Sequence, residues 1–148
     1  MKLVFVCAFF ISLNCFSSDF KLVGYLPSYE KLDPNKMGLL SELILFSAEP
    51  GEAGELLMSG PLEDLLKRTE ELVKPRKVLC IGGWGKSKNF PKMTGSKKLR
   101  KVFIENVMDV LKKYNLSGID YDWEHPKTKA EETAYGKLIQ ESAERGIT

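Results

Sequence analysis

Three carboxylates alternate with bulky side chains in the stretch 117–124, which has the sequence Ser-Gly-Ile-Asp-Tyr-Asp-Trp-Glu. Successive side chains of an extended strand point to opposite faces, so Asp120, Asp122 and Glu124 are predicted to share one face. Their Cα atoms would be roughly 6.5 to 7 Å apart, and a charge on one carboxylate would disfavour a charge on the next. Such a row of carboxylates destabilises a fold, but it suits acid–base chemistry.

The opposite face of the same stretch carries Ile119, Tyr121 and Trp123. Large apolar side chains on that face favour a strand that packs against helices. The acidic face is therefore predicted to point into a barrel or a cleft. A different chemistry stays open, because a metal-dependent glycosyltransferase would use Asp120 and Asp122 as a metal-binding pair. Mg²⁺ or Mn²⁺ would then need further ligands from outside this strand.

This stretch resembles the signature of family 18 glycoside hydrolases, the chitinases and their relatives, whose fourth barrel strand has the pattern Asp-Gly-x-Asp-x-Asp-x-Glu. Gly118, Asp120, Asp122 and Glu124 match that pattern, whereas Ser117 replaces its first Asp. The resemblance implies that Glu124 is the general acid and that Asp122 orients the 2-acetamido group of the substrate, which serves as the nucleophile. It also implies that Asp120 tunes Asp122.

The implied reaction is hydrolysis of β-1,4 bonds between N-acetylglucosamine units in chitin or a related glycan, with retention of configuration and without a metal or other cofactor. Some members of this family are lectin-like, because their acid Glu has been replaced. A glycan-binding protein without catalytic activity is therefore the alternative. The retained Glu124 favours the enzyme over that alternative.

A second motif lies in the apolar run 77–84, which ends in a double glycine. It resembles the third-strand motif Ser-x-Gly-Gly of the same family, with Cys80 at the serine position. Gly82 and Gly83 would let the substrate or another backbone approach closely, where a Cβ atom would block it. Trp84 would stack on a sugar ring of the substrate.

Two departures from the family pattern are expected to meet in the fold. The family's serine on strand three and its first Asp on strand four share the layer beneath the catalytic carboxylates. Cys80 and Ser117 are therefore predicted to occupy that layer, where a thiol and a hydroxyl carry no negative charge near neutral pH. Because Cys80 lies in mid-strand and points inward, it is predicted to be a structural, buried residue.

Strand-like and helix-like segments alternate along the chain, which predicts an α/β fold with a parallel sheet. The predicted strands are 21–26, 43–48, 77–84 and 117–124. The predicted helices are 61–73, 97–114 and one that begins at the capping box 128–131, all on one face of the sheet. The first strand resembles the first barrel strand of the family, in which Tyr25 would lie at the barrel floor and contact the substrate.

A complete (β/α)8 TIM barrel takes about 250 residues, so about 130 residues after residue 17 would hold about four of its units. The sequence therefore predicts the first half of a family 18 barrel over residues 18–148. The family's tyrosine on strand six and tryptophan on strand eight would lie beyond these units. A second chain or the C-terminal half of the barrel would then complete the site.

Residues 1–17 are predicted to be a secretory signal peptide, with a basic start, an apolar run and a small-x-small end. The protein would then be extracellular or periplasmic, and its mature chain would keep Cys80 as a single thiol with no intramolecular disulfide. The apolar run 3–13 is too short to span a bilayer, so no membrane association is expected after cleavage. The net charge of +2 and the dispersed basic residues predict no nucleic-acid partner.

Overall fold

The computed structural model describes residues 20–147. The predicted signal peptide, with Cys7 and Cys15, lies outside the described residues. Among residues 20–147, no helix has both the length and the apolar character that a membrane crossing requires.

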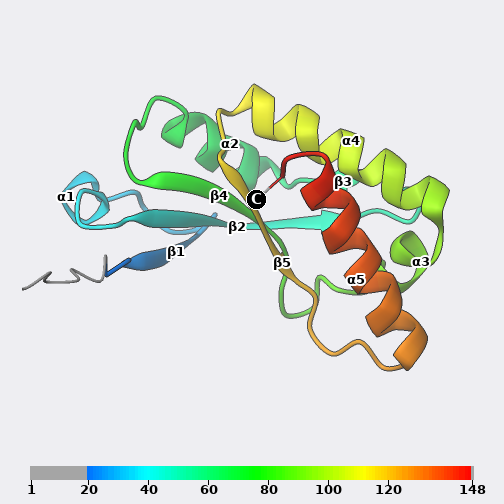
Figure 1. Ribbon diagram of the computed structural model, residues 1–148. Helices are drawn as coiled ribbons and strands as arrows, with labels where there is room; N and C mark the ends of the chain where they lie inside the picture. The colour runs from blue at the N-terminus through cyan, green and yellow to red at the C-terminus, as the bar shows by residue number, and fades with distance from the viewer. Residues whose placement is uncertain (1–19, 148) are drawn as a thin grey trace, which may run out of the picture.

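The sheet is parallel, and its strands follow one another in chain order (Figure 1). These strands are β1 (Val23–Pro27), β2 (Glu42–Pro50), β4 (Arg76–Gly82) and β5 (Gly118–Asp122). The predicted parallel pairing is thus confirmed. A short strand, β3 (Leu56–Leu57), pairs antiparallel with the end of β2, in a segment that the sequence did not indicate as a strand. Within the described chain, β1 and β5 are the two edges of the parallel sheet.

The three predicted helices are present, and each begins at a side chain that accepts a hydrogen bond from the first turn. They are α2 (Gly60–Thr69), α4 (Lys97–Lys113) and α5 (Lys129–Glu144), with Ser59, Ser96 and Thr128 as their respective N-caps. Such caps satisfy backbone N–H groups that the helix itself leaves without partners. Two short helices were not predicted, namely α1 (Pro34–Met37) and α3 (Phe90–Gly95).

Helix α2 is shorter than the predicted helix 61–73, because it ends at Thr69. Val73 therefore lies outside the helix, where its side chain is 93% exposed. The buried Lys77 of β4 explains the early end, since its Nζ donates hydrogen bonds to the carbonyls of Thr69 and Glu70 at 2.9 and 2.8 Å. A longer helix would have used these two carbonyls itself, and a cation at the helix C-terminus is favourable.

The main hydrophobic core lies between the sheet and the helices that cover one of its faces (Figure 1). Alternate side chains of β2 and β4 enter this core and meet the apolar sides of α2, α4 and α5. Its fully buried members include Leu43, Leu45, Leu62, Leu65, Leu66, Leu79, Ile81, Phe103, Val107 and Leu138. All three long helices therefore lie on one face of the sheet, as predicted.

A smaller cluster lies on the opposite face of the sheet, which is called the inner face below. It consists of Ile44, Val78 and Cys80, with Phe46 packed against them. Both faces of β2 and β4 are thus apolar, which is usual for central strands of a parallel sheet.

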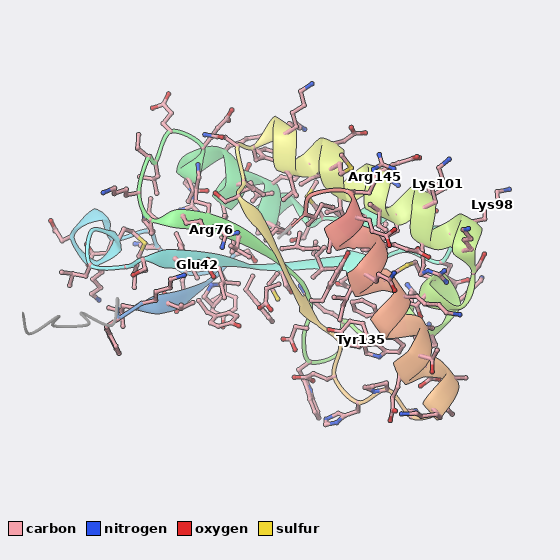
Figure 2. The ribbon with its side chains drawn as sticks, in the orientation of Figure 1. Glu42, Arg76, Lys98, Lys101, Tyr135 and Arg145 are labelled. Carbon is pink, nitrogen blue, oxygen red and sulfur yellow. The ribbon has the colours of Figure 1, made fainter. Side chains whose placement is uncertain are left out.

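An ionic contact joins the strands at the end of the sheet where β2 and β4 begin. Arg76 forms an ion pair with Glu42 at 2.7 Å and donates a hydrogen bond to the carbonyl of Ser117 at 3.1 Å (Figure 2). The contact fixes the starts of β2, β4 and β5 relative to one another. The acidic motif lies at the opposite end of the sheet, near the carboxyl ends of the strands.

Candidate active site

Asp120 and Asp122 lie on the inner face of β5, as their alternation predicts. In the parallel register, Asp120 is opposite Cys80 and Asp122 is opposite Gly82. The intervening Tyr121 packs instead against the main core beneath the helices. The two carboxylates are therefore near the carboxyl ends of the strands, on the side that the helices leave uncovered.

Tyr25 contacts Asp120 directly, although 95 residues separate them in the chain. The Tyr25 hydroxyl donates a hydrogen bond to Oδ2 of Asp120 at 2.9 Å. Partial burial, followed by the hydrogen bond and the charge of Asp120, raises the pKa of Tyr25 to about 12. The hydroxyl therefore remains protonated and able to donate throughout the neutral range. The sequence indicated Tyr25 as a substrate contact, which stays a prediction, but it gave no sign of this bond.

Trp123 is anchored on the helix side of the sheet, immediately before Glu124. Its ring stacks on Phe90 with a centroid separation of 5.1 Å and meets the edge of Tyr135 at 5.3 Å. The Tyr135 hydroxyl also donates a hydrogen bond to the carbonyl of Tyr121 at 2.8 Å. This aromatic cluster confirms that the apolar side chains of the motif pack against helices. It also holds the end of β5 in place.

Glu124 lies beyond the end of β5, because the strand stops at Asp122 and not at residue 124 as predicted. The chain turns at once, since His125 adopts the left-handed conformation with φ of 60°. The Glu124 amide donates a hydrogen bond to Oγ of Ser87 at 3.3 Å. A local turn therefore positions Glu124, whereas strand pairing positions Asp120 and Asp122.

A surface pocket of about 590 Å³ opens beside Glu124. Trp84, which is 83% exposed, forms part of its wall together with Trp123 and His125. An exposed indole next to a carboxylate offers a flat apolar surface for a ring-shaped ligand. Stacking of Trp84 on a sugar stays a prediction.

Gly82 and Gly83 allow the end of β4 to approach β5 closely. Gly82 has a φ of +112°, and a Cβ atom at this residue would lie 2.3 Å from the carbonyl oxygen of Asp122. At Gly83, a Cβ atom would lie 2.5 Å from Cζ of Phe46. The Gly83 amide donates a hydrogen bond to the same Asp122 carbonyl at 2.8 Å. The predicted close approach is thus to backbone at Gly82 and to the Phe46 ring at Gly83, and contact with a substrate stays a prediction.

The predicted layer of Cys80 and Ser117 is wrong. Ser117 precedes β5 and is exposed, and its amide donates a hydrogen bond to the carbonyl of Lys77. Cys80 is buried on the inner face, where it is opposite Asp120. The register between β4 and β5 places Asp120 opposite Cys80. Ser117, which replaces the family's first Asp, therefore lies away from the thiol.

Cys80 is expected to react with a thiol reagent about 100-fold more slowly in the native protein than in the unfolded chain. Burial, followed by the charges of Asp120 and Asp122, raises the pKa of its thiol. The folded protein therefore holds the thiol proton more tightly than the unfolded chain does. The free energy of unfolding is unaffected by this thiol below the unfolded pKa near 9.0, and it falls as the pH rises above that value. Labelling at pH 8 with and without guanidinium measures the ratio. Similar rates would show that water reaches the inner face beneath the carboxylates.

The chain is similar in sequence and in fold to known glycosyl hydrolases. Residues 21–146 match the sequence model of glycosyl hydrolases family 18. Over 103 residues the chain is 32% identical to sporulation-specific chitinase 2 of Saccharomyces cerevisiae, a match that covers 68% of this chain and 20% of that protein. Chitinase RmChi1 of Rhizomucor miehei superposes with a TM-score of 0.72 and 26% identity, over 84% of this chain and 43% of that one.

A second solved structure has the same fold. The GH18 chitinase of Cycas revoluta, in complex with (GlcNAc)3, superposes with a TM-score of 0.74 and 22% identity, over 85% of this chain and 40% of that one. The chain thus spans less than half the length of these relatives.

Proposed function

This chain belongs to glycosyl hydrolases family 18 and has the fold of part of its (β/α)8 barrel, and from that membership we propose that Asp120, Asp122 and Glu124 act in the hydrolysis of β-1,4 bonds between N-acetylglucosamine units. The position of Glu124 carries the proposal. It is the first carboxylate beyond β5, at the carboxyl end of the strands, where barrels of this kind place their chemistry. It also borders the pocket that Trp84 lines.

Each carboxylate has its own task in the proposed reaction. Glu124 protonates the leaving glycosidic oxygen and then activates a water molecule. Asp122 orients the substrate's acetamido group, whose oxygen attacks the anomeric carbon, and it stabilises the cyclic intermediate that results. Asp120 tunes Asp122 from one step further down the inner face, and the hydrogen bond from Tyr25 keeps Asp120 in place.

The proposed substrate is chitin or a related glycan with N-acetylglucosamine units. Trp84 supplies an exposed aromatic surface for a sugar ring beside Glu124, and Gly82 and Gly83, where β4 ends, are the further proposed substrate contacts. A second set of strands, on the same polypeptide or on another, would complete the wall around the carboxylates, because four strands are half of an eight-stranded barrel. Action outside the cell, which the predicted signal peptide implies, is part of the same proposal.

Hydrolysis of an N-acetylglucosamine tetramer by the completed barrel, in which this chain is joined to or reconstituted with the second set of strands, tests this function, with and without EDTA. Products are separated by chromatography, and the anomer released first is identified by NMR. We expect a retained anomer and equal rates with and without the chelator, because the proposed mechanism uses no metal. Loss of activity on chelation would favour the metal-dependent glycosyltransferase class. Binding of the tetramer without hydrolysis would favour the glycan-binding alternative.

A further inference from the structure

The loop that follows β4, residues 83–89, is fastened to the carboxyl ends of strands on both sides of β4. Toward β2, the Nζ of Lys86 donates a hydrogen bond to the carbonyl of Ser47, and Nδ2 of Asn89 donates to the carbonyl of Pro50, both at 3.0 Å. Toward β5, Ser87 is the one side chain of this loop for which the described structure shows hydrogen bonds. Lys86 and Asn89 thus bind this loop to β2, whereas Ser87 binds it to β5 and Glu124.

Ser87 places a single hydroxyl among three backbone groups. Its Oγ accepts a hydrogen bond from the amide of Glu124 at 3.3 Å. The hydroxyl can donate to the carbonyl of Gly83 at 3.4 Å or to that of Asp122 at 3.5 Å. A serine has one proton to donate, so the two carbonyls share it, and long contacts are the expected geometry. The half-buried side chain of Ser87 therefore connects the end of β4 to the backbone of Asp122 and of Glu124, the two residues that flank Trp123.

The backbone at Glu124 depends on this contact more than its neighbours do. Asp122 is held by the parallel ladder with β4 and by the amide of Gly83. Trp123 is held by its aromatic contacts, and the chain then turns at His125. In the part of the chain that the structure describes, the Glu124 amide has Ser87 as its hydrogen-bond partner. Removing the Ser87 hydroxyl would therefore remove the hydrogen bond that holds the Glu124 amide.

We propose that Ser87 is a positioning residue that fixes Glu124 relative to Asp122 by binding the backbone of both. This inference rests on the proposed function, because the spacing of the two carboxylates matters only if they act on one substrate. Glu124 must protonate an oxygen on the same bond at which the acetamido group held by Asp122 attacks. Small displacements of such groups reduce rates strongly.

The experiment uses three variants of the full chain, namely Ser87→Ala, Ser87→Thr and Asn89→Ala. Exchange of the Glu124 amide with D₂O is measured by NMR, which requires no catalytic activity. Ser87→Ala is expected to accelerate this exchange by about tenfold, because the amide loses its acceptor. Ser87→Thr keeps a hydroxyl and should restore slow exchange. Asn89→Ala removes the anchor to β2 in the same loop and should leave the Glu124 amide unchanged.

Turnover of the N-acetylglucosamine tetramer is measured for the same variants in the completed barrel. We expect Ser87→Ala to lower kcat by about tenfold with little change in KM, Ser87→Thr to recover most of it, and Asn89→Ala to keep the wild-type kcat. Unchanged exchange at Glu124 in Ser87→Ala would overturn the inference, whether or not the protein hydrolyses the tetramer. Faster exchange with an unchanged kcat would overturn it as well. A completed barrel of wild-type sequence that does not hydrolyse the tetramer would refute the proposed function, and the exchange data would still decide whether Ser87 positions Glu124.

Discussion

In the completed barrel, replacing Glu124 with glutamine is expected to lower turnover of an N-acetylglucosamine oligomer by about 10² to 10⁴-fold or more. Glutamine keeps the size of the side chain and its ability to form hydrogen bonds, but it has no proton to give to the leaving oxygen. It also cannot accept a proton from water in the second step. Because Glu124 is only half-buried at the edge of an open pocket, the substitution should not disturb the fold.

Binding of the oligomer should survive in Glu124→Gln, and calorimetric titration measures it beside the rate. Glu132→Gln is the matched control, since Glu132 is an exposed residue of the first turn of α5 that pairs with Lys129. It removes the same charge nearby and should leave turnover unchanged. Equal rates for wild type and Glu124→Gln would remove Glu124 from the mechanism. Loss of binding in Glu124→Gln would show that the residue holds the substrate in its ground state.

The sequence predicted correctly those parts of the fold that depend on local periodicity. Ile119, Tyr121 and Trp123 alternate with Asp120 and Asp122, and a two-residue period assigns the two sets to opposite faces of any extended strand. The capping box that begins at Thr128 likewise marks the start of α5, where the Thr128 hydroxyl accepts a hydrogen bond from the amide of Glu131. These signals lie within a few residues, so they need no knowledge of the neighbouring strands.

Two of the incorrect predictions depend on contacts between segments that are distant in the chain. The layer of Cys80 and Ser117 was inferred from the family pattern, but the offset of β5 against β4 decides which residues are opposite each other. No local pattern encodes that offset. The early end of α2 has the same origin, since Lys77 reaches it from a strand that follows in the chain.

The candidate site was predictable where a motif marks it and unpredictable where a single polar side chain acts. The double glycine after β4 and the acidic motif are distinct in sequence, and the structure brings Gly82 and Asp122 into one register pair. Ser87 is one serine in a loop with several polar residues, so its contact with the Glu124 amide had no sequence signal. Tyr25 was noted for its position on β1, whereas its bond to Asp120 joins the two edge strands of the parallel sheet across β2 and β4.

Gly82→Ala is expected to lower the free energy of unfolding by about 3 kcal/mol or more, which corresponds to a fall in melting temperature of about 10 °C. Two causes add at this residue. Its φ of +112° is one that side chains rarely adopt, and the new Cβ atom would lie 2.3 Å from the carbonyl oxygen of Asp122. That oxygen belongs to backbone within the ladder and cannot rotate away. Thermal and urea unfolding of the two proteins measure the loss.

Gly85→Ala separates these two causes. Gly85 also has a positive φ, +76°, but a Cβ atom at this residue would meet nothing within 4 Å. Its alanine variant should therefore lose only about 1 kcal/mol, from backbone strain alone. Equal losses for the two variants would show that β5 yields easily at Asp122. A larger loss of stability in Gly82→Ala would show that β4 and β5 are held rigidly together at Asp122. The close approach of the two backbones that Gly82 permits would then set the position of the Asp122 carboxylate.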